Sequence, residues 1–213
     1  MAGLTFNPKT APRRAPRFEL TAGIVCLDFA NTLDNRASDH PEELIKSYND
    51  LLHFLEDTRA MAPSQVVRLI ERAYLSPKEA LHTLQAAIEL REAIYQIMWA
   101  LLHKKTVPAM ALAQLNGYVE YAAQHAHLVQ KGSRFEWRLD ELGGFDVVLW
   151  PIARSAADLL SSDQLPFVRA CSSKTCEWLF LDTSKNHRRR WCDMKVCGNR
   201  AKARSFYAKN KTA

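Results

Sequence analysis

Apolar residues recur every three or four positions over most of the first 130 residues, which is the spacing of one face of an α-helix. Ser76 and Pro77 are typical of a helix start, because a capping hydroxyl is followed by proline in the first turn. Gly132 is typical of a helix end. The predicted helices cover 24–33, 41–56, 64–74, 77–103, 108–130 and 152–160.

A period of two replaces the helical spacing at residues 133–141, where apolar and polar side chains alternate. Phe135, Trp137 and Leu139 would then face the core from one strand. A turn at 142–144 and a second strand at 145–150 would complete a small antiparallel sheet. The predicted fold class is therefore α+β, with a mostly helical N-terminal domain; a further short strand is expected at 17–20.

Four cysteines near the C-terminus have the spacing C-x4-C-x15-C-x4-C, formed by Cys171, Cys176, Cys192 and Cys197. Two close pairs separated by a short segment are typical of a structural zinc site, since each pair supplies two corners of a tetrahedron. Two disulfides, or four ordinary buried thiols, are the alternatives. No signal peptide is visible, so we expect a reducing, cytoplasmic location, where paired cysteines more often bind metal.

The residues between the cysteine pairs predict a small treble-clef-like module. A strand is expected at 177–182, a turn at 183–186 and a returning strand at 187–191, with a helix after Cys197. So few residues bury little apolar surface, so the metal should supply much of the folding free energy. We expect a flexible basic tail at 1–16, a helical body at 17–165 that folds without the module, and the zinc module at 166–213.

Two phrases at opposite ends of the chain resemble known families. Cys-Gly-Asn-Arg at 197–200, after Trp191-Cys192 and the first cysteine pair, resembles the CGNR zinc finger. Leu-Asp-Phe-Ala-Asn-Thr at 27–32 is similar to the opening phrase of the ABATE domain, the usual N-terminal partner of that finger. The resemblance implies a zinc-containing, stress-induced transcription regulator, with the body as a ligand-sensing or dimerisation domain.

The charge of the chain is unevenly distributed. Residues 184–213 hold ten Lys or Arg against one acid, a net charge of +9, and residues 1–17 carry +4. Because the whole chain is +6, residues 18–183 carry −7. An acidic body joined to a basic module indicates a polyanionic partner for the module.

The basic residues of the module are the candidate contacts to DNA phosphates or bases. On a strand, Arg188 and Arg190 would share one side and Arg189 would point to the other. The full candidate set is Arg188, Arg189, Arg190, Arg200, Lys202 and Arg204. RNA is a less favoured partner, because charge alone does not distinguish the two nucleic acids. A zinc-stabilised protein-interaction adaptor is a further alternative.

Polar residues among apolar neighbours at Asp28, Asn31 and Arg36 are a weaker candidate site. They could line a pocket for a small-molecule effector, or they could be helix caps and turn formers. No hydrolase, phosphate-loop or metalloprotease motif is present, and four thiolate ligands leave no open zinc position, so we do not expect an enzyme. A homodimer is possible, and no apolar run reaches the length of a membrane span.

Overall fold

The computed structural model describes residues 16–139 and 144–210, and it has the predicted α+β class. The helices are α1 Val25–Ala30, α2 Tyr48–Asp57, α3 Pro63–Leu75, α4 Pro77–Leu102, α5 Ala109–His125, α6 Trp150–Leu160 and α7 Asn199–Asn210. Short helical turns lie at Phe145–Leu149, Leu165–Phe167 and Met194–Gly198. The strands form three antiparallel pairs: β1 Leu33–Asp34 with β2 Glu42–Glu43, β3 Ala126–Lys131 with β4 Arg134–Leu139, and β5 Val168–Ala170 with β6 Leu179–Leu181.

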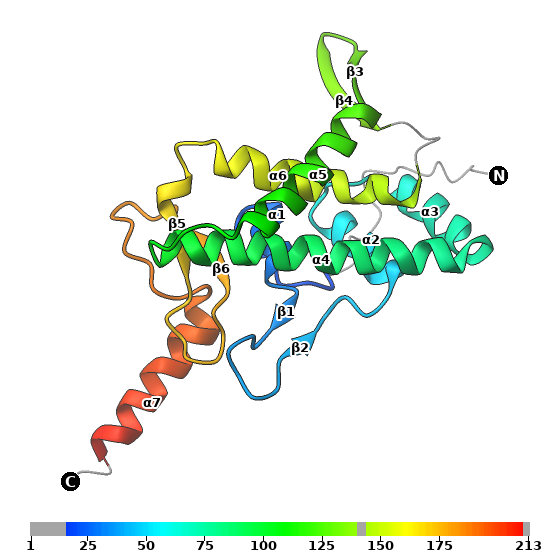
Figure 1. The fold of residues 1–213 in the computed structure, drawn as a ribbon. Helices are drawn as coiled ribbons and strands as arrows, with labels where there is room; N and C mark the ends of the chain where they lie inside the picture. Colours follow the sequence, from blue (N-terminus) through cyan, green and yellow to red (C-terminus); the bar gives the residue numbers. More distant parts are fainter. Residues whose placement is uncertain (1–15, 140–143, 211–213) are drawn as a thin grey trace, which may run out of the picture.

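The short helix α1 lies at the centre of the body. Leu27 and Phe29 of α1 are almost completely buried, as are Leu90 and Ile94 of the long helix α4 that crosses it. Figure 1 shows α2, α5 and α6 packed around these two helices, while the β3–β4 hairpin and α7 project from the body on opposite sides. No helix within the described residues is long and apolar enough to cross a membrane.

The predicted helices at 64–74, 77–103 and 152–160 match α3, α4 and α6 closely. The prediction at 41–56 is wrong in its first part, because α2 begins only at Tyr48. The Ser47 hydroxyl accepts a hydrogen bond from the Asp50 amide at 3.1 Å and caps the helix there. The prediction at 24–33 is too long, since α1 ends at Ala30.

The predicted helix at 108–130 ends early, because residues 126–131 form a strand. Each residue of β3 pairs with one of β4, from Ala126 opposite Leu139 to Lys131 opposite Arg134. Phe135 and Trp137 are 67% and 47% exposed, so the expectation that they face the core is wrong. Residues 145–149 form a 3-10 helix and not the expected strand, and most of the turn predicted at 142–144 lies outside the described residues.

The predicted hairpin inside the zinc module is also wrong. Strand β6 pairs with β5, which precedes the first cysteine, and residues 187–191 form a loop. Leu179 and Phe180 of β6 are completely buried within a core that includes body residues. No strand forms at 17–20; there Phe18 packs edge-on against Phe54, 5.5 Å between ring centres. All but the last residue of the predicted tail at 1–16 lies outside the described part, and the domain boundary at residue 165 stays a prediction.

Candidate metal centre and nucleic-acid interface

Three short backbone features bring the four cysteines together. Cys171 follows β5, and its amide donates to the Trp178 carbonyl at 2.8 Å, which closes the first cysteine loop. The Ser172 amide donates to the Arg190 carbonyl at 2.8 Å and joins this loop to the segment before the second pair. The Asp193 side chain caps the helical turn that carries Cys197 into α7.

The four sulfur atoms lie within 4.8 Å of one another, and all four cysteines are buried. The Cys176 and Cys192 Sγ atoms are 3.6 Å apart, and those of Cys192 and Cys197 are 3.7 Å apart. In a tetrahedral site with Zn–S bonds of about 2.3 Å, two sulfurs lie about 3.8 Å apart. The cluster therefore has the dimensions of a structural zinc site, and it matches the spacing that the sequence indicated.

The thiols of this cluster influence one another's protonation. Hydrogen bonds with Cys176 and Cys192 lower the pKa of Cys171, while the same contact raises the pKa of Cys176. A first thiolate therefore forms readily, and the thiolate is the form that binds metal. Cys26 differs, because burial raises the pKa of its thiol to about 12 and it lies apart from the cluster in α1.

The three consecutive arginines of the loop point in different directions. Arg188 and Arg190 are exposed, and Arg190 lies over the Trp191 ring. Arg189 turns inward: its guanidinium donates to the carbonyls of Trp191 and Cys192 and lies 4.5 Å from the centre of the Phe180 ring. Although no strand forms here, the alternation expected from one is present. Arg189 stabilises the fold of the finger instead of contributing to its outer surface.

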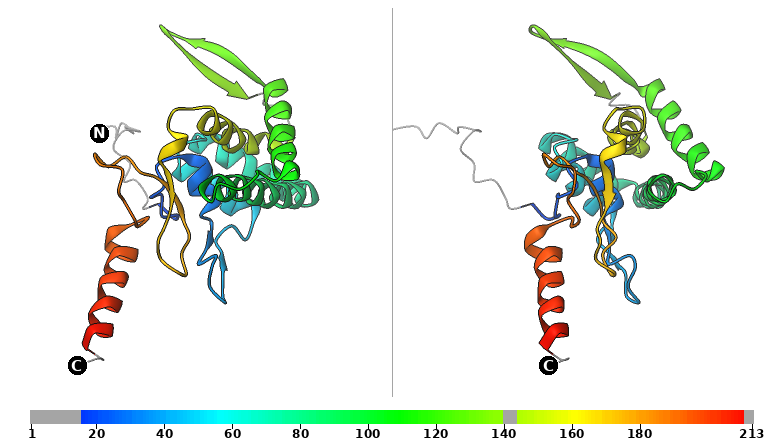
Figure 2. Two further views of the ribbon diagram at one scale, coloured as in Figure 1. Left: turned by 60° about the vertical axis from the view of Figure 1, so that its left-hand side comes forward. Right: turned by 90° about the vertical axis from the view of Figure 1, so that its left-hand side faces the viewer.

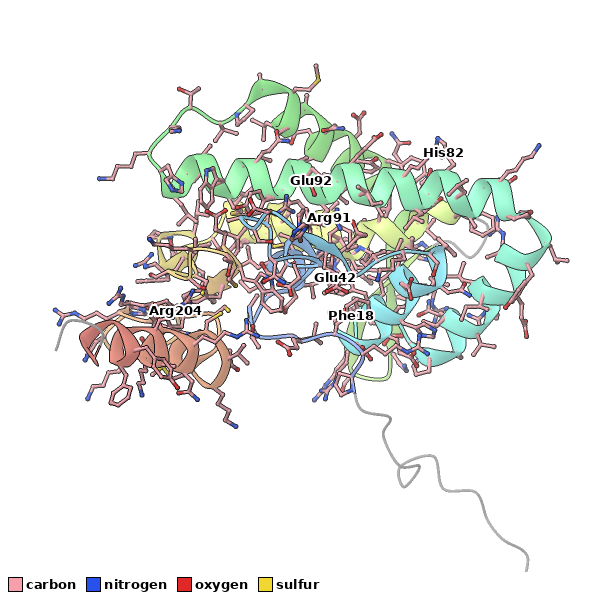
Figure 3. All side chains as sticks on the ribbon, turned by 90° about the horizontal axis from the view of Figure 1, so that it is seen from below. Phe18, Glu42, His82, Arg91, Glu92 and Arg204 are labelled. Atoms are coloured by element: carbon pink, nitrogen blue, oxygen red, sulfur yellow. The ribbon has the colours of Figure 1, made fainter. Side chains whose placement is uncertain are left out.

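Helix α7 starts at the fourth cysteine and extends away from the body (Figure 2). Arg200, Lys202 and Arg204 are all exposed on it. Arg204, labelled in Figure 3, also reaches back to the Ser173 hydroxyl at 3.4 Å. Together with Arg188 and Arg190, these residues form the exposed basic surface of the finger.

Asn31 connects the body to the finger. Its side-chain amide donates to the Leu179 carbonyl and accepts from the Leu179 amide, both at 2.8 Å, although the two residues are 148 positions apart. Two residues further along β6, the Leu181 amide donates to the Ala22 carbonyl at 2.9 Å. The Asp28 carboxylate accepts from the Ala22 amide at 2.9 Å, and burial raises the pKa of Asp28 to about 6. Asn31 therefore holds β6 directly, while Asp28 fixes Ala22, whose carbonyl binds the next inward-facing amide of β6.

Arg36 belongs to a second set of contacts beside this one. It forms a bidentate pair with Glu92 at 2.6 and 3.1 Å, and its guanidinium lies 3.9 Å from the centre of the Tyr95 ring. The Tyr95 hydroxyl donates to Glu177 of the finger at 3.2 Å. The three predicted effector contacts, Asp28, Asn31 and Arg36, therefore bind other parts of the protein itself.

No local pattern in the sequence predicts the ion pairs of the buried Arg91 on α4. Arg91 is 3% exposed and donates to Glu43 at 2.7 Å and to Glu92 at 3.0 Å. Figure 3 shows Arg91 and Glu92 where α4 passes the segment that follows α1. The pairing with Arg36 and Arg91 outweighs burial and lowers the pKa of Glu92. A charged residue in an amphipathic helix normally lies on the solvent-exposed face. Arg91 can be recognised as buried only from its distant partner Glu43.

A cavity of about 280 Å³ lies at the seam between body and finger. It is bounded by Arg17 and Asn35 of the body and by Trp178 and Arg200 of the finger, next to three of the cysteines. The indole N–H of Trp178 is buried and has no hydrogen-bond partner among the described residues. This is a polar contact point that sequence periodicity could not reveal.

Comparison with known proteins agrees with this geometry. Residues 23–163 match the ABATE family, described as "Putative stress-induced transcription regulator", and residues 168–210 match the CGNR zinc finger. The first match covers more than half of the chain, so the chain belongs to the ABATE family. No curated protein matches the chain. With its clustered thiols and its CGNR finger, this family member is a zinc-binding protein.

Proposed function

We propose that the chain is a DNA-binding transcription regulator whose contacts to DNA come from its zinc finger. The observation that carries the proposal is the exposed basic surface, formed by Arg188, Arg190, Arg200, Lys202 and Arg204. It is built around the cysteine cluster, whereas the body carries net negative charge. A regulator of this kind acts in the cytoplasm with the chromosome, and it needs no catalytic step.

The positions of α7 and the loop arginines suggest which residues of the finger would contact bases and which would contact phosphates. A projecting helix such as α7 can enter a major groove, where base edges are read, while flanking arginines contact phosphates. Arg188 and Arg190 are the proposed phosphate contacts, and Arg200 and Arg204, four residues apart on α7, are the proposed base contacts. In this proposal Cys171, Cys176, Cys192 and Cys197 hold the zinc ion that fixes the loop and α7 relative to each other.

Selection from a random DNA pool, followed by salt titration on the selected sequence, tests this proposal. If about four of the finger's basic residues neutralise phosphates, Arg188 and Arg190 among them, the slope of log K against log salt is near −4, because each contact contributes about −0.9. Replacing Arg188 and Arg190 together by alanine should flatten the slope by about two units. The matched control replaces the exposed body residues Lys78 and Lys105 by alanine, which removes the same charge and should leave the slope unchanged.

The same titration distinguishes the alternatives. Tighter binding to structured RNA than to any DNA at matched salt would replace DNA by RNA as the partner. No binding to either nucleic acid by the zinc-loaded chain would indicate a protein-interaction adaptor, with the basic surface docking on an acidic protein.

We further propose that a small effector, if it regulates this finger, binds in the cavity at the seam. Trp178 and Arg200 both line it. An occupant there would contact the start of α7 directly and so change how Arg200 is presented to DNA. Ligands that raise the melting temperature of the wild type but not of Trp178→Phe would support this location, because phenylalanine removes part of the cavity wall.

A further inference from the structure

The β3–β4 hairpin, residues 126–139 and here named the arm, projects beyond the body in both views of Figure 2. Its two strands are joined by Gly132 and Ser133, and Gly132 has φ +64°. Glycine at the first position of a two-residue turn is typical of a tight hairpin with strongly twisted strands. The arm is therefore a regular antiparallel hairpin closed by a tight glycine turn.

One face of the arm is apolar and exposed. Leu128 pairs with Trp137 and Gln130 with Phe135, so these side chains lie on the same face of the two strands. Leu128, Phe135 and Trp137 are 56%, 67% and 47% exposed. An isolated two-stranded hairpin is at best marginally stable in water, and one apolar face normally packs on something. Within the described residues, the body covers only the base of this face.

A hollow of about 640 Å³ lies on the body at the base of the arm. Trp137 and Trp150 border it with their rings 6.0 Å apart, and the Arg154 guanidinium lies over both rings. Its floor contains Ile24 and Leu159. The same chain thus carries an exposed apolar arm and an apolar hollow, and Trp137 is shared by both.

We propose that the arm of one copy of this chain docks in the hollow of a second copy, and that the exchange is reciprocal. An arm and a hollow on one chain are complementary to those of a second copy related by a two-fold axis. Among the charged groups, Arg134 lies at the tip of the arm, and the hollow is bordered by Asp158, whose side chain is 69% exposed although it pairs with Arg154 at 3.4 Å. Lys131, also at the tip, pairs with Glu136 of the arm itself at 3.3 Å.

The surface available fits a dimer of moderate affinity. With roughly 200 Å² for a whole aromatic side chain, Phe135 and Trp137 expose about 230 Å² on each arm. Two arms and the two hollow walls they would cover then bury about 900 Å², before Leu128 and the polar rim are added. Stable interfaces bury about 1,200–2,000 Å² in total, so we expect dissociation in the micromolar range.

The docking does not depend on the proposed function. If the chain also binds DNA as proposed, the dimer leads to an expectation about the DNA sequence. A two-fold dimer carries two copies of α7, so the DNA that it selects should contain two related half-sites. Dimerisation without DNA binding would leave the docking intact and remove only this expectation.

Sedimentation equilibrium of the full-length, zinc-loaded protein tests the docking. The wild type should be dimeric at tens of micromolar, and Phe135→Glu should raise the dissociation constant at least tenfold. Leu75→Glu is the matched control: Leu75 is 85% exposed at the end of α3, so the same change of chemistry is made far from the arm and should leave the dimer intact.

A substitution on the other partner surface separates arm-in-hollow docking from contact between two arms. Gln164 is exposed at the edge of the hollow, and Gln164→Trp should obstruct entry and also weaken the dimer at least tenfold. A dimer weakened by Phe135→Glu but not by Gln164→Trp would overturn the exchange in favour of pairing between arms. A wild type that is monomeric throughout, or a dimer that Phe135→Glu leaves unchanged, would overturn the proposal altogether.

Discussion

Replacing Asn31, the residue directly after α1, by alanine should weaken the attachment of the finger to the body. Asn31 is 3% exposed, and its side chain forms both hydrogen bonds with Leu179. Alanine would remove both partners at once. The amide and carbonyl of Leu179 would stay buried without compensation, because the rest of β6 holds them in place.

The magnitude follows from these two groups. A buried donor or acceptor that loses its partner costs about 1–3 kcal/mol, so the two together should cost about 2–6 kcal/mol. Domains unfold with about 5–15 kcal/mol in total. Asn31→Ala should therefore lower the free energy of unfolding by a large fraction, although it touches neither a cysteine nor the exposed basic surface.

Urea unfolding of the zinc-loaded protein, followed by circular dichroism, measures this change. Asn116→Ala is the control, because Asn116 is exposed on α5 and its loss should change stability by less than about 0.5 kcal/mol. Hydrogen exchange should show faster exchange at the Leu179 and Leu181 amides in Asn31→Ala only. If Asn31→Ala unfolds within about 0.5 kcal/mol of the wild type, the connection between α1 and β6 is not what holds the finger to the body.

Three further predictions follow from the same contacts. In urea unfolding, Arg189→Ala should lower the free energy of unfolding by about 2 kcal/mol or more, because hydrogen bonds from a charged group are lost. In salt titration, the same variant should leave the slope of DNA binding unchanged. A flatter slope would show that Arg189 does contact DNA. Burial raises the folded pKa of Asp28 to about 6 against 3.8, so the fold is most stable below pH 4 and loses this stability as pH rises through 6. Asp28→Asn should therefore gain about 2.5 kcal/mol on the wild type between pH 4 and pH 7 in paired urea titrations, and a pH-independent difference would contradict this. The sequence alone predicts that residues 17–165 fold without the module, but the contacts of β6 with Asn31 and Ala22 lead us to expect the opposite. A chain of residues 17–165 should lose its cooperative thermal transition, because it lacks the buried strand β6, and a melting temperature within a few degrees of the full chain would instead support an independent body.

Local patterns in the sequence predicted the parts of this protein that depend on local rules. Helices α3 and α4 follow their apolar periodicity, and the cysteine spacing identified the sulfur cluster without any knowledge of the fold. The helix predicted at 108–130 extends into β3 because the apolar and polar residues at 126–131 suit the end of a helix as well as a strand. The pairing with β4, and not local preference, decides their conformation.

The local order of apolar and polar residues does not predict contacts between distant segments. Asn31 among apolar neighbours suggests either a cap or a pocket, and its real partner, Leu179, lies at the other end of the chain. The sequence predicts the strand at 177–182 but places its partner later in the chain, at 187–191. The real partner, β5, precedes the first cysteine. The seam between body and finger is therefore the part of the site that required the structure.

We propose that the zinc-organised finger binds DNA, and a comparison of DNA affinities with and without its zinc ion tests this most directly. The affinity for the selected DNA is measured by equilibrium titration for the zinc-loaded wild type and for Cys197→Ser, with metal content determined on the same samples. We predict about one zinc per chain for the wild type, and for Cys197→Ser a sharp loss of zinc with at least a hundredfold weaker DNA binding, while the helical signal of the body remains. Equal DNA affinity in the two proteins, with zinc absent from the variant, would contradict the account.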